Sequence, residues 1–246
     1  PIMEFDWDDD ISNLAFSSDS NYLITANEDG HIVQHSLLDS SKQNIITIKE
    51  EVDAIKYSPD GTLLAINTKK KNLHLVSLTS KKIVKTLNTE KGYEYFLFSH
   101  NNDYLFTINK QKEATLTIWP IKTNAEPTSI YNISAFGEDQ IKLSKNNNMF
   151  IITNEKEVWS LDTMQKVLAF DYSHEISALD FTPDGEKVIA ITNSGLIQKW
   201  PLFGDNLIEN AKKKLALSHI CLTAEERVSY YLPPLTEAER KIRGCF

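Results

Sequence analysis

The chain has 246 residues, of which 41% are apolar and 24% are charged, and its net charge is −8. This composition is typical of a globular protein and excludes collagen-like and disordered chains. No apolar run reaches the roughly 18 residues of a membrane span, and an acidic chain is repelled by phosphate backbones, so we expect neither a membrane nor a nucleic-acid partner. Two cysteines, Cys221 and Cys245, are too few for a disulfide framework, which favours a reducing, cytoplasmic setting.

One unit recurs five times along the chain: an aromatic residue or Leu, then Ser or Thr, then a turn. The Ser or Thr positions are separated by 41, 41, 45 and 38 residues, close to the roughly 40–45 residues of a four-stranded propeller blade. These positions are Ser17, Ser58, Ser99, Ser144 and Thr182. We therefore expect an all-β fold, a β-propeller of four-stranded antiparallel blades over residues 1–204, with inner strands near 11–16, 52–57, 93–98, 138–143 and 176–181.

Residues 2–7 alternate between apolar and polar side chains ahead of the first inner strand, which predicts an outermost strand. Two interpretations follow. This strand completes the fifth blade of a self-contained five-bladed ring, or it ends an upstream blade of a larger ring. Because the chain does not begin with Met, we favour a larger ring and a segment of a longer protein.

Residues 205–246 differ from the repeats in character. Capping boxes begin at Thr223 and Thr236, and both are typical of helix starts. Apolar residues at helical spacing precede them, at Leu207, Ile208, Ala211 and Leu215. We expect a helical C-terminal strap here.

Several motifs in the repeats resemble the WD-repeat β-propeller family over about residues 1–204. The family's Ser-Pro-Asp-Gly turn is intact at residues 58–61, and its loop Asp-Gly is present as Asp29-Gly30. Its third-strand Trp is matched by Trp119, Trp159 and Trp200, and its His by His174, so the resemblance implies structural roles for these residues. The Asp that follows the family's Trp is absent, so we expect the blades to depend more on apolar packing than on the family's buried hydrogen-bond network.

An Asn closes the second strand of every unit, where the WD-repeat family has Ser. Asn tolerates a left-handed backbone and bonds neighbouring backbone groups, so the main interpretation is a turn device. The alternative is a polar ring that also contacts a ligand. The residues are Asn27, Asn67, Asn109, Asn154 and Asn193.

The segment from Cys221 to Glu226, followed by Tyr230-Tyr231, resembles the C-terminal tails of bacterial WD-repeat proteins. Many of those proteins carry the propeller behind a signalling ATPase or a caspase-like protease domain. The resemblance therefore implies a larger bacterial signalling or antiviral defence protein, with an effector domain fused upstream.

The catalytic motifs that we considered are absent from the sequence. The glycines are too scattered for a phosphate-binding loop or a dinucleotide fingerprint, and no nucleophile elbow is present. A propeller enzyme would need a convergent site in the central channel, where Asp53, Glu94 and Asp139 are expected without histidine ligands. We expect no catalytic residue, no metal and no cofactor, and keep a channel enzyme as the less favoured alternative.

Acidic residues gather on the connections that enter the inner strands, at the end of the propeller that we call the top. Lysines at 69–71, 110, 112 and 156 lie on the neighbouring loops at larger radius. An acidic channel mouth favours a basic peptide or cationic side chain, with Tyr93 and Tyr172 as aromatic anchors. The alternative is an ordinary solvated mixture of charges, with these aromatic side chains buried between blades. The acidic residues are Asp8, Asp9, Asp10, Glu50, Glu51, Asp53, Glu94 and Asp139.

Charged residues also occupy equivalent positions in the middle of three inner strands, at Lys56, Lys142 and Asp180. A crowded inner strand does not leave a charge alone, so we expect Lys142 to pair with Asp180 of the adjacent blade.

Together these features predict a non-catalytic interaction scaffold that displays its loops rigidly to a protein or peptide partner.

Overall fold

The computed structural model of the chain describes residues 10–88, 92–109, 114–134, 140–146, 148–170 and 176–202. The expected strand at 2–7 and the expected helical strap at 205–246 lie outside these residues.

Nineteen strands form five antiparallel sheets within the described residues. The first two blades comprise β1 (Ile11–Phe16), β2 (Tyr22–Asn27), β3 (His31–Ser36), β4 (Lys42–Thr47), β5 (Val52–Tyr57), β6 (Leu63–Thr68), β7 (Asn72–Ser77) and β8 (Lys82–Asn88). The next two comprise β9 (Tyr95–Phe98), β10 (Tyr104–Asn109), β11 (Ala114–Pro120), β12 (Thr128–Ile133), β13 (Ile141–Leu143), β14 (Met149–Ile152), β15 (Glu157–Ser160) and β16 (Lys166–Ala169). The fifth comprises β17 (Ile176–Phe181), β18 (Lys187–Thr192) and β19 (Ile197–Pro201).

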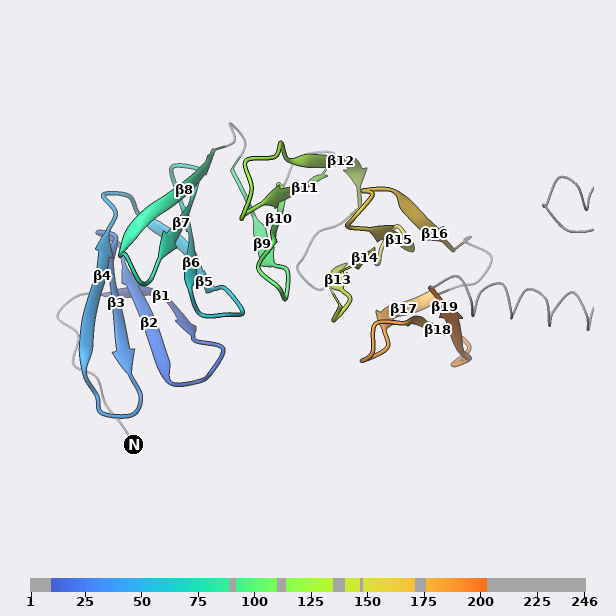
Figure 1. Cartoon of the computed structure of the whole chain (residues 1–246), viewed down its shortest axis with the longest axis horizontal. Helices are drawn as coiled ribbons and strands as arrows, with labels where there is room; N and C mark the ends of the chain where they lie inside the picture. The colour runs from blue at the N-terminus through green and yellow to red at the C-terminus, as the bar shows by residue number, and fades with distance from the viewer. Residues whose placement is uncertain are drawn as a thin grey trace, which may run out of the picture.

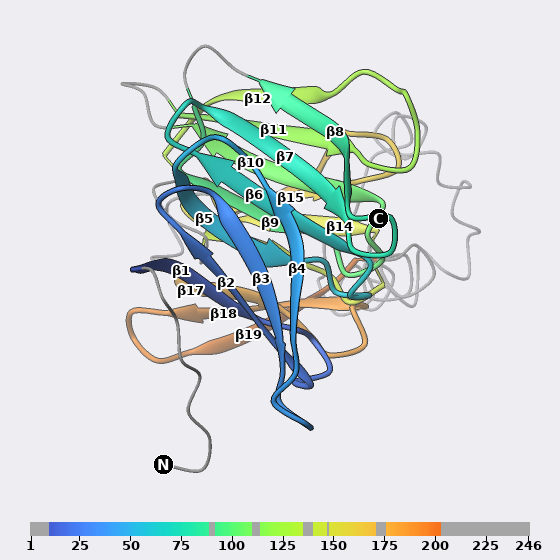
Figure 2. The same ribbon diagram turned by 90° about the vertical axis from the view of Figure 1, so that its left-hand side faces the viewer.

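Each sheet is an up-and-down meander of strands consecutive in the chain. Figure 1 shows the sheets following one another along an arc, with β4, β8, β12 and β16 on its convex side. Figure 2, a quarter turn away, shows the same sheets stacked one behind another. The predicted fold class is confirmed: the chain is all-β in its described part, with four four-stranded antiparallel sheets and one three-stranded sheet in a propeller arrangement. The arc formed by the described sheets is open, because the first and fifth sheets lie at its two ends (Figure 1).

The turn after each inner strand is built in the same way in all five blades. The hydroxyl of its Ser or Thr donates to an Asp or Asn two residues later, at 2.7 Å from Ser58 to Asp60. The same oxygen accepts the backbone N–H five residues later, at 2.9 Å from Leu63 to Ser58. Because these bonds join residues only two and five positions apart, the repeat can be recognised from the sequence.

Apolar side chains fill the space between successive blades. Because side chains alternate along a strand, each blade presents one face to the blade before it and the other to the blade after it. A cluster of buried residues lies at each of the four interfaces between described blades. Trp119, Trp159 and Trp200 pack against the clusters that join their own blade to the preceding one.

Two blades nevertheless keep a side-chain hydrogen bond at the position of the WD-repeat network. Trp119 Nε1 donates to Thr107 Oγ1 at 2.8 Å in the third blade, and His35 Nε2 lies 2.9 Å from Thr25 Oγ1 in the first. Burial, followed by the nearby Lys42, lowers the pKa of His35, so its neutral form is favoured. In the second blade Val76 takes this place and packs in an apolar cluster. The expected shift to apolar packing therefore differs from blade to blade.

The expected ion pair between Lys142 and Asp180 is wrong: both residues are described and they form no ion pair. Equivalent positions in successive blades point to the same side, and so they do not face each other across an interface. Lys56, at the same position in the second blade, lies over the Phe96 ring of the third blade at 5.4 Å. Asp180 is exposed and its carboxylate accepts the N–H of Phe181 at 2.7 Å.

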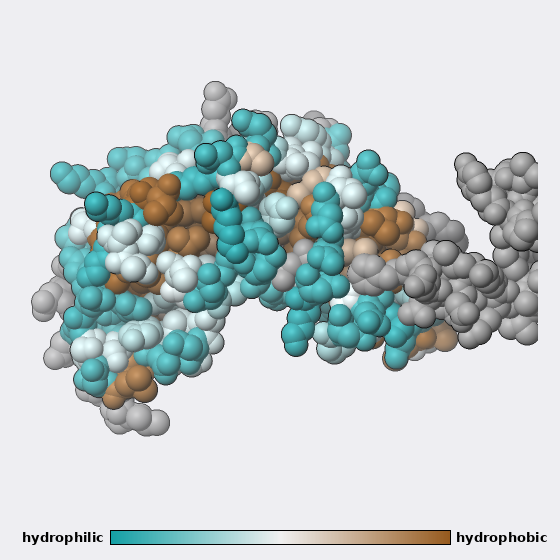
Figure 3. Space-filling model, in the orientation of Figure 1, coloured by the Kyte–Doolittle hydropathy of each residue, from teal (hydrophilic) through white to brown (hydrophobic). Residues whose placement is uncertain are grey.

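The two end blades each leave an apolar face open. Phe16 is 60% exposed, whereas its counterpart Phe98 in the third blade is 7% exposed. On the fifth blade Ile197 is 61% exposed, whereas its counterpart Leu73 in the second blade is completely buried. These side chains have the pattern of an interface between blades without a neighbour among the described residues. Figure 3 shows a mostly hydrophilic face, with hydrophobic patches that include the lower end of the first sheet.

Candidate interaction surfaces

Antiparallel meanders place the connections entering the inner strands at one end of every blade, the top. Asp10 precedes β1, Asp53 is the second residue of β5 and Glu94 precedes β9, and all three are exposed. The structure therefore brings one exposed carboxylate to the top of each of three successive inner strands. Asp8, Asp9, Asp139, Tyr172 and His174 lie outside the described residues.

Glu50, expected on the acidic rim, is instead largely buried within the second blade. Its carboxylate accepts hydrogen bonds from Thr68 Oγ1 at 2.7 Å and from Asn72 Nδ2 at 3.0 Å. His74 Nε2 lies 3.5 Å from the same carboxylate, while His74 Nδ1 lies 2.9 Å from Thr86 Oγ1. Burial alone would raise the pKa of Glu50, but the bonds from Thr68 and Asn72 and the nearby His74 lower it. This network joins the entry loop to β7, so it holds the blade together.

Glu51 lies beside the lysine loop of the same blade. Its carboxylate pairs with the ammonium group of Lys69, and the hydrogen bond to Glu51 raises the pKa of Lys69. Both side chains are solvent-exposed, so the pair contributes little stability. The ion pair reduces the net charge where the acidic rim meets the basic outer loops.

Tyr93 is 7% exposed and packs in the cluster between the second and third blades, so its side chain is not displayed as an anchor. Its backbone carbonyl accepts a hydrogen bond from Asn67 Nδ2 at 3.1 Å, and the same amide donates to Asp53 Oδ2 at 3.0 Å. Asn67 thus fixes the orientation of Asp53 and ties it to the next blade.

The other members of the Asn series also lie at or near the ends of the second strands. Asn27 Oδ1 accepts the N–H of His31 at 2.8 Å, and Asn109 Oδ1 accepts that of Thr115 at 3.0 Å. Asn154 Nδ2 donates to the carbonyl of Ser134 at 2.6 Å, and Asn193 lies in the turn after β18. No member of the series has a positive φ. The side chains of Asn27 and Asn109 therefore bond backbone groups within six residues, whereas those of Asn67 and Asn154 bond carbonyls 26 and 20 residues away, and none of the five residues uses the left-handed backbone that Asn would tolerate.

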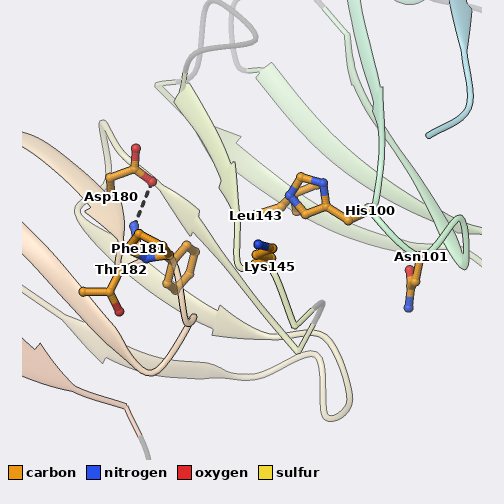
Figure 4. A pocket seen from close by; sticks show the side chains of 8 residues that line it. His100, Asn101, Leu143, Lys145, Asp180, Phe181 and Thr182 are labelled. Carbon is orange, nitrogen blue, oxygen red and sulfur yellow. Dashed lines mark hydrogen bonds between the residues drawn. The ribbon is translucent and has the colours of Figure 1, made fainter. Parts of the chain in front are cut away.

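A pocket lies at the opposite end of the blades from the top, which we call the bottom. It has a volume of about 590 Å³ and is formed by the turns that follow the inner strands of the third, fourth and fifth blades. In Figure 4, His100 and Asp180 lie on opposite sides of it, with Lys145 and Phe181 between them. Sequence reasoning missed this pocket, although the signal was present: the third and fourth turns carry His100 and Lys145 where the second and fifth carry Pro.

Within the described part of the chain, no group of three or more His, Cys, Asp or Glu side chains is arranged to hold a metal ion. The same residues include no helix with the length and apolar character needed to cross a membrane.

Repeated four-stranded sheets with exposed charged loops at both ends define a β-propeller, a scaffold-type fold whose loops display binding residues on a rigid frame. Residues 2–130, slightly more than half of the 246, match the family model described as the NUP159/214 beta propeller. The chain therefore belongs to the NUP159/214 β-propeller family. No curated protein matches the chain. The WD-repeat motifs and the bacterial tail remain predictions.

Proposed function

We propose that the chain is a non-catalytic protein-interaction scaffold whose top surface binds a protein or peptide with basic side chains. The observation that carries this proposal is the row of exposed carboxylates formed by Asp10, Asp53 and Glu94 on three successive inner strands. Because the sheets fix these groups, binding costs little ordering entropy, and several like charges on one surface attract a cationic partner over a longer range than one charge does. Glu50 and Tyr93 are left out of this surface because neither side chain is displayed.

We further propose that the five blades are part of a larger ring in a longer protein. The open faces of the first and fifth blades support this reading, since Phe16 and Ile197 are exposed while their counterparts between the second and third blades, Phe98 and Leu73, are buried. The tail motifs support the narrower proposal of a cytoplasmic bacterial signalling or antiviral defence protein with an upstream effector domain.

The top surface can be tested with an amidated peptide, Gly-Lys-Arg-Gly-Lys-Arg-Gly, titrated into the chain by calorimetry. We expect saturable binding that weakens as salt is raised. The double variant Asp53→Asn/Glu94→Gln should bind about fivefold more weakly, because two exposed charges are lost while size is kept. The matched control is Glu126→Gln/Glu186→Gln, which removes two exposed charges from the bottom loops. Equal weakening by both double variants would contradict a specific top surface.

A further inference from the structure

The five turns at the bottom of the blades differ in charge although they share one hydrogen-bond pattern. In the first, second and fifth blades the hydroxyl donates to an Asp, and in the third and fourth it donates to Asn101 and Asn146. These bonds, from Ser17 and Thr182 respectively, lower the pKa of Asp19 and of Asp184, so those turns are anionic.

The residue before each Asp or Asn changes as well. It is Ser or Pro in the three acidic turns, but His100 and Lys145 in the turns that carry Asn. Both side chains are exposed. In these two blades the amide oxygen of an Asn accepts the bond that an Asp carboxylate accepts in the other three, and the residue before the Asn is basic. Lys145 therefore places a positive group in the fourth turn where the first, second and fifth turns carry a carboxylate, and the third turn has the basic ring of His100 with Asp103 paired to Lys122.

The pocket lies between these two turns and the turn of the fifth blade. His100 and Lys145 line it together with the apolar side chains of Leu143 and Phe181 (Figure 4). Pro183 lines it as well. Its volume of about 590 Å³ is within the range of ligand-binding pockets. The site thus combines a hydrogen-bonding cationic side with an apolar floor.

We propose that this pocket binds an acidic side chain of a protein partner, with an adjacent apolar side chain on the floor formed by Leu143 and Phe181. A carboxylate can accept from the Lys145 ammonium group and from the His100 ring. Asp180 on the opposite side repels a second anion, so a single acidic residue next to an apolar one fits better than a run of acids (Figure 4). This site lies at the opposite end of the blades from Asp53 and Glu94, so the scaffold would hold a basic and an acidic partner segment at once.

The test uses the amidated and acetylated peptide Gly-Ser-Phe-Glu-Phe-Ser-Gly, whose only charge is its Glu, titrated into the ¹⁵N-labelled chain and followed by amide chemical shifts. We expect saturable shifts in the turns around His100, Lys145 and Thr182. The peptide with Gln in place of Glu should bind at least about fivefold more weakly, as should Lys145→Gln with the original peptide. Lys82→Gln, which removes an exposed lysine from the outer strand of the second blade, should bind as the unchanged chain does.

Three results would overturn the proposal. The Glu and Gln peptides could bind equally, Lys82→Gln could weaken binding as much as Lys145→Gln, or inorganic phosphate could shift these turns while the Glu peptide does not, which would make the pocket a small-anion site. Asp53→Asn/Glu94→Gln should leave this binding unchanged, so failure of the top surface and failure of this pocket are distinguishable.

Discussion

The inner strands of the first and third blades have the same alternating pattern and opposite environments. In β9, Phe96 and Phe98 are 2% and 7% exposed because the second blade covers them. In β1, the corresponding Leu14 and Phe16 are 59% and 60% exposed. The difference teaches that an inner strand gains its burial from the adjacent blade and not from its own sheet. As in other repeat architectures, each interface between neighbours is a separate source of stability, and the end units differ from the middle ones.

The strongest test of this difference between β9 and β1 is to remove one aromatic ring from each strand. Phe96→Ala should lower the free energy of unfolding by about 3–5 kcal/mol, because it leaves a cavity between the second and third blades. Phe16→Ala, the matched control, should cost less than about 1 kcal/mol, because its ring is mostly in contact with water. Urea unfolding followed by circular dichroism measures both. Comparable losses would mean that the open face of the first blade is covered in solution.

Glu50 and Glu51 are adjacent in the chain, but the side chain of Glu50 is more covered than that of Glu51. Glu50→Gln should cost about 1–3 kcal/mol, because a neutral amide replaces a partly buried acceptor of bonds from Thr68 and Asn72. Glu51→Gln should cost at most about 0.5 kcal/mol, because its pair with Lys69 is exposed. Urea unfolding of the two variants at neutral pH gives both values.

Acid titration supplies an independent check on Glu50. Since the folded state lowers its pKa, its contribution to stability is complete above the unfolded value of about 4.3 and is lost as the pH falls through the folded value. The unchanged chain should therefore lose more stability between pH 5 and pH 3 than Glu50→Gln does, and a parallel loss in the two proteins would contradict the buried network.

The contrast between Glu50 and Ser58 also explains what the sequence could predict. The turn at Ser58 uses partners within five residues, so its pattern is visible in the sequence, and with it the period, the strands and the fold class. Glu50 was expected on the rim because it lies beside Glu51 in a loop. Its partners Thr68, Asn72 and His74 are 18 to 24 residues away, and only the pairing of β6 with β7 brings them to it.

Tyr93 illustrates the same limit, since a loop aromatic can be displayed or buried and only the packing of the next blade decides. The bottom pocket is a different case. Its basic residues, His100 and Lys145, could have been found by comparing the five turns position by position, because a change in one repeat against the others is a local signal.

The smallest expected loss of stability concerns the repeated turn, where the buried Ser58 can be compared with its partner Asp60. Ser58 is completely buried, and Ser58→Ala removes both the bond to Asp60 and the acceptor of the Leu63 N–H, so it should cost about 1–2 kcal/mol. Asp60→Asn should change stability by less than about 0.5 kcal/mol in the same urea experiment, because Asn101 and Asn146 accept the equivalent bond at 2.8 and 2.7 Å in two other blades. If Asp60→Asn costs as much as Ser58→Ala, the negative charge and not the hydrogen bond holds this turn. The Asn in the third and fourth turns would then carry a stability penalty, and the replacement of Asp by Asn beside His100 and Lys145 would come at the expense of the fold.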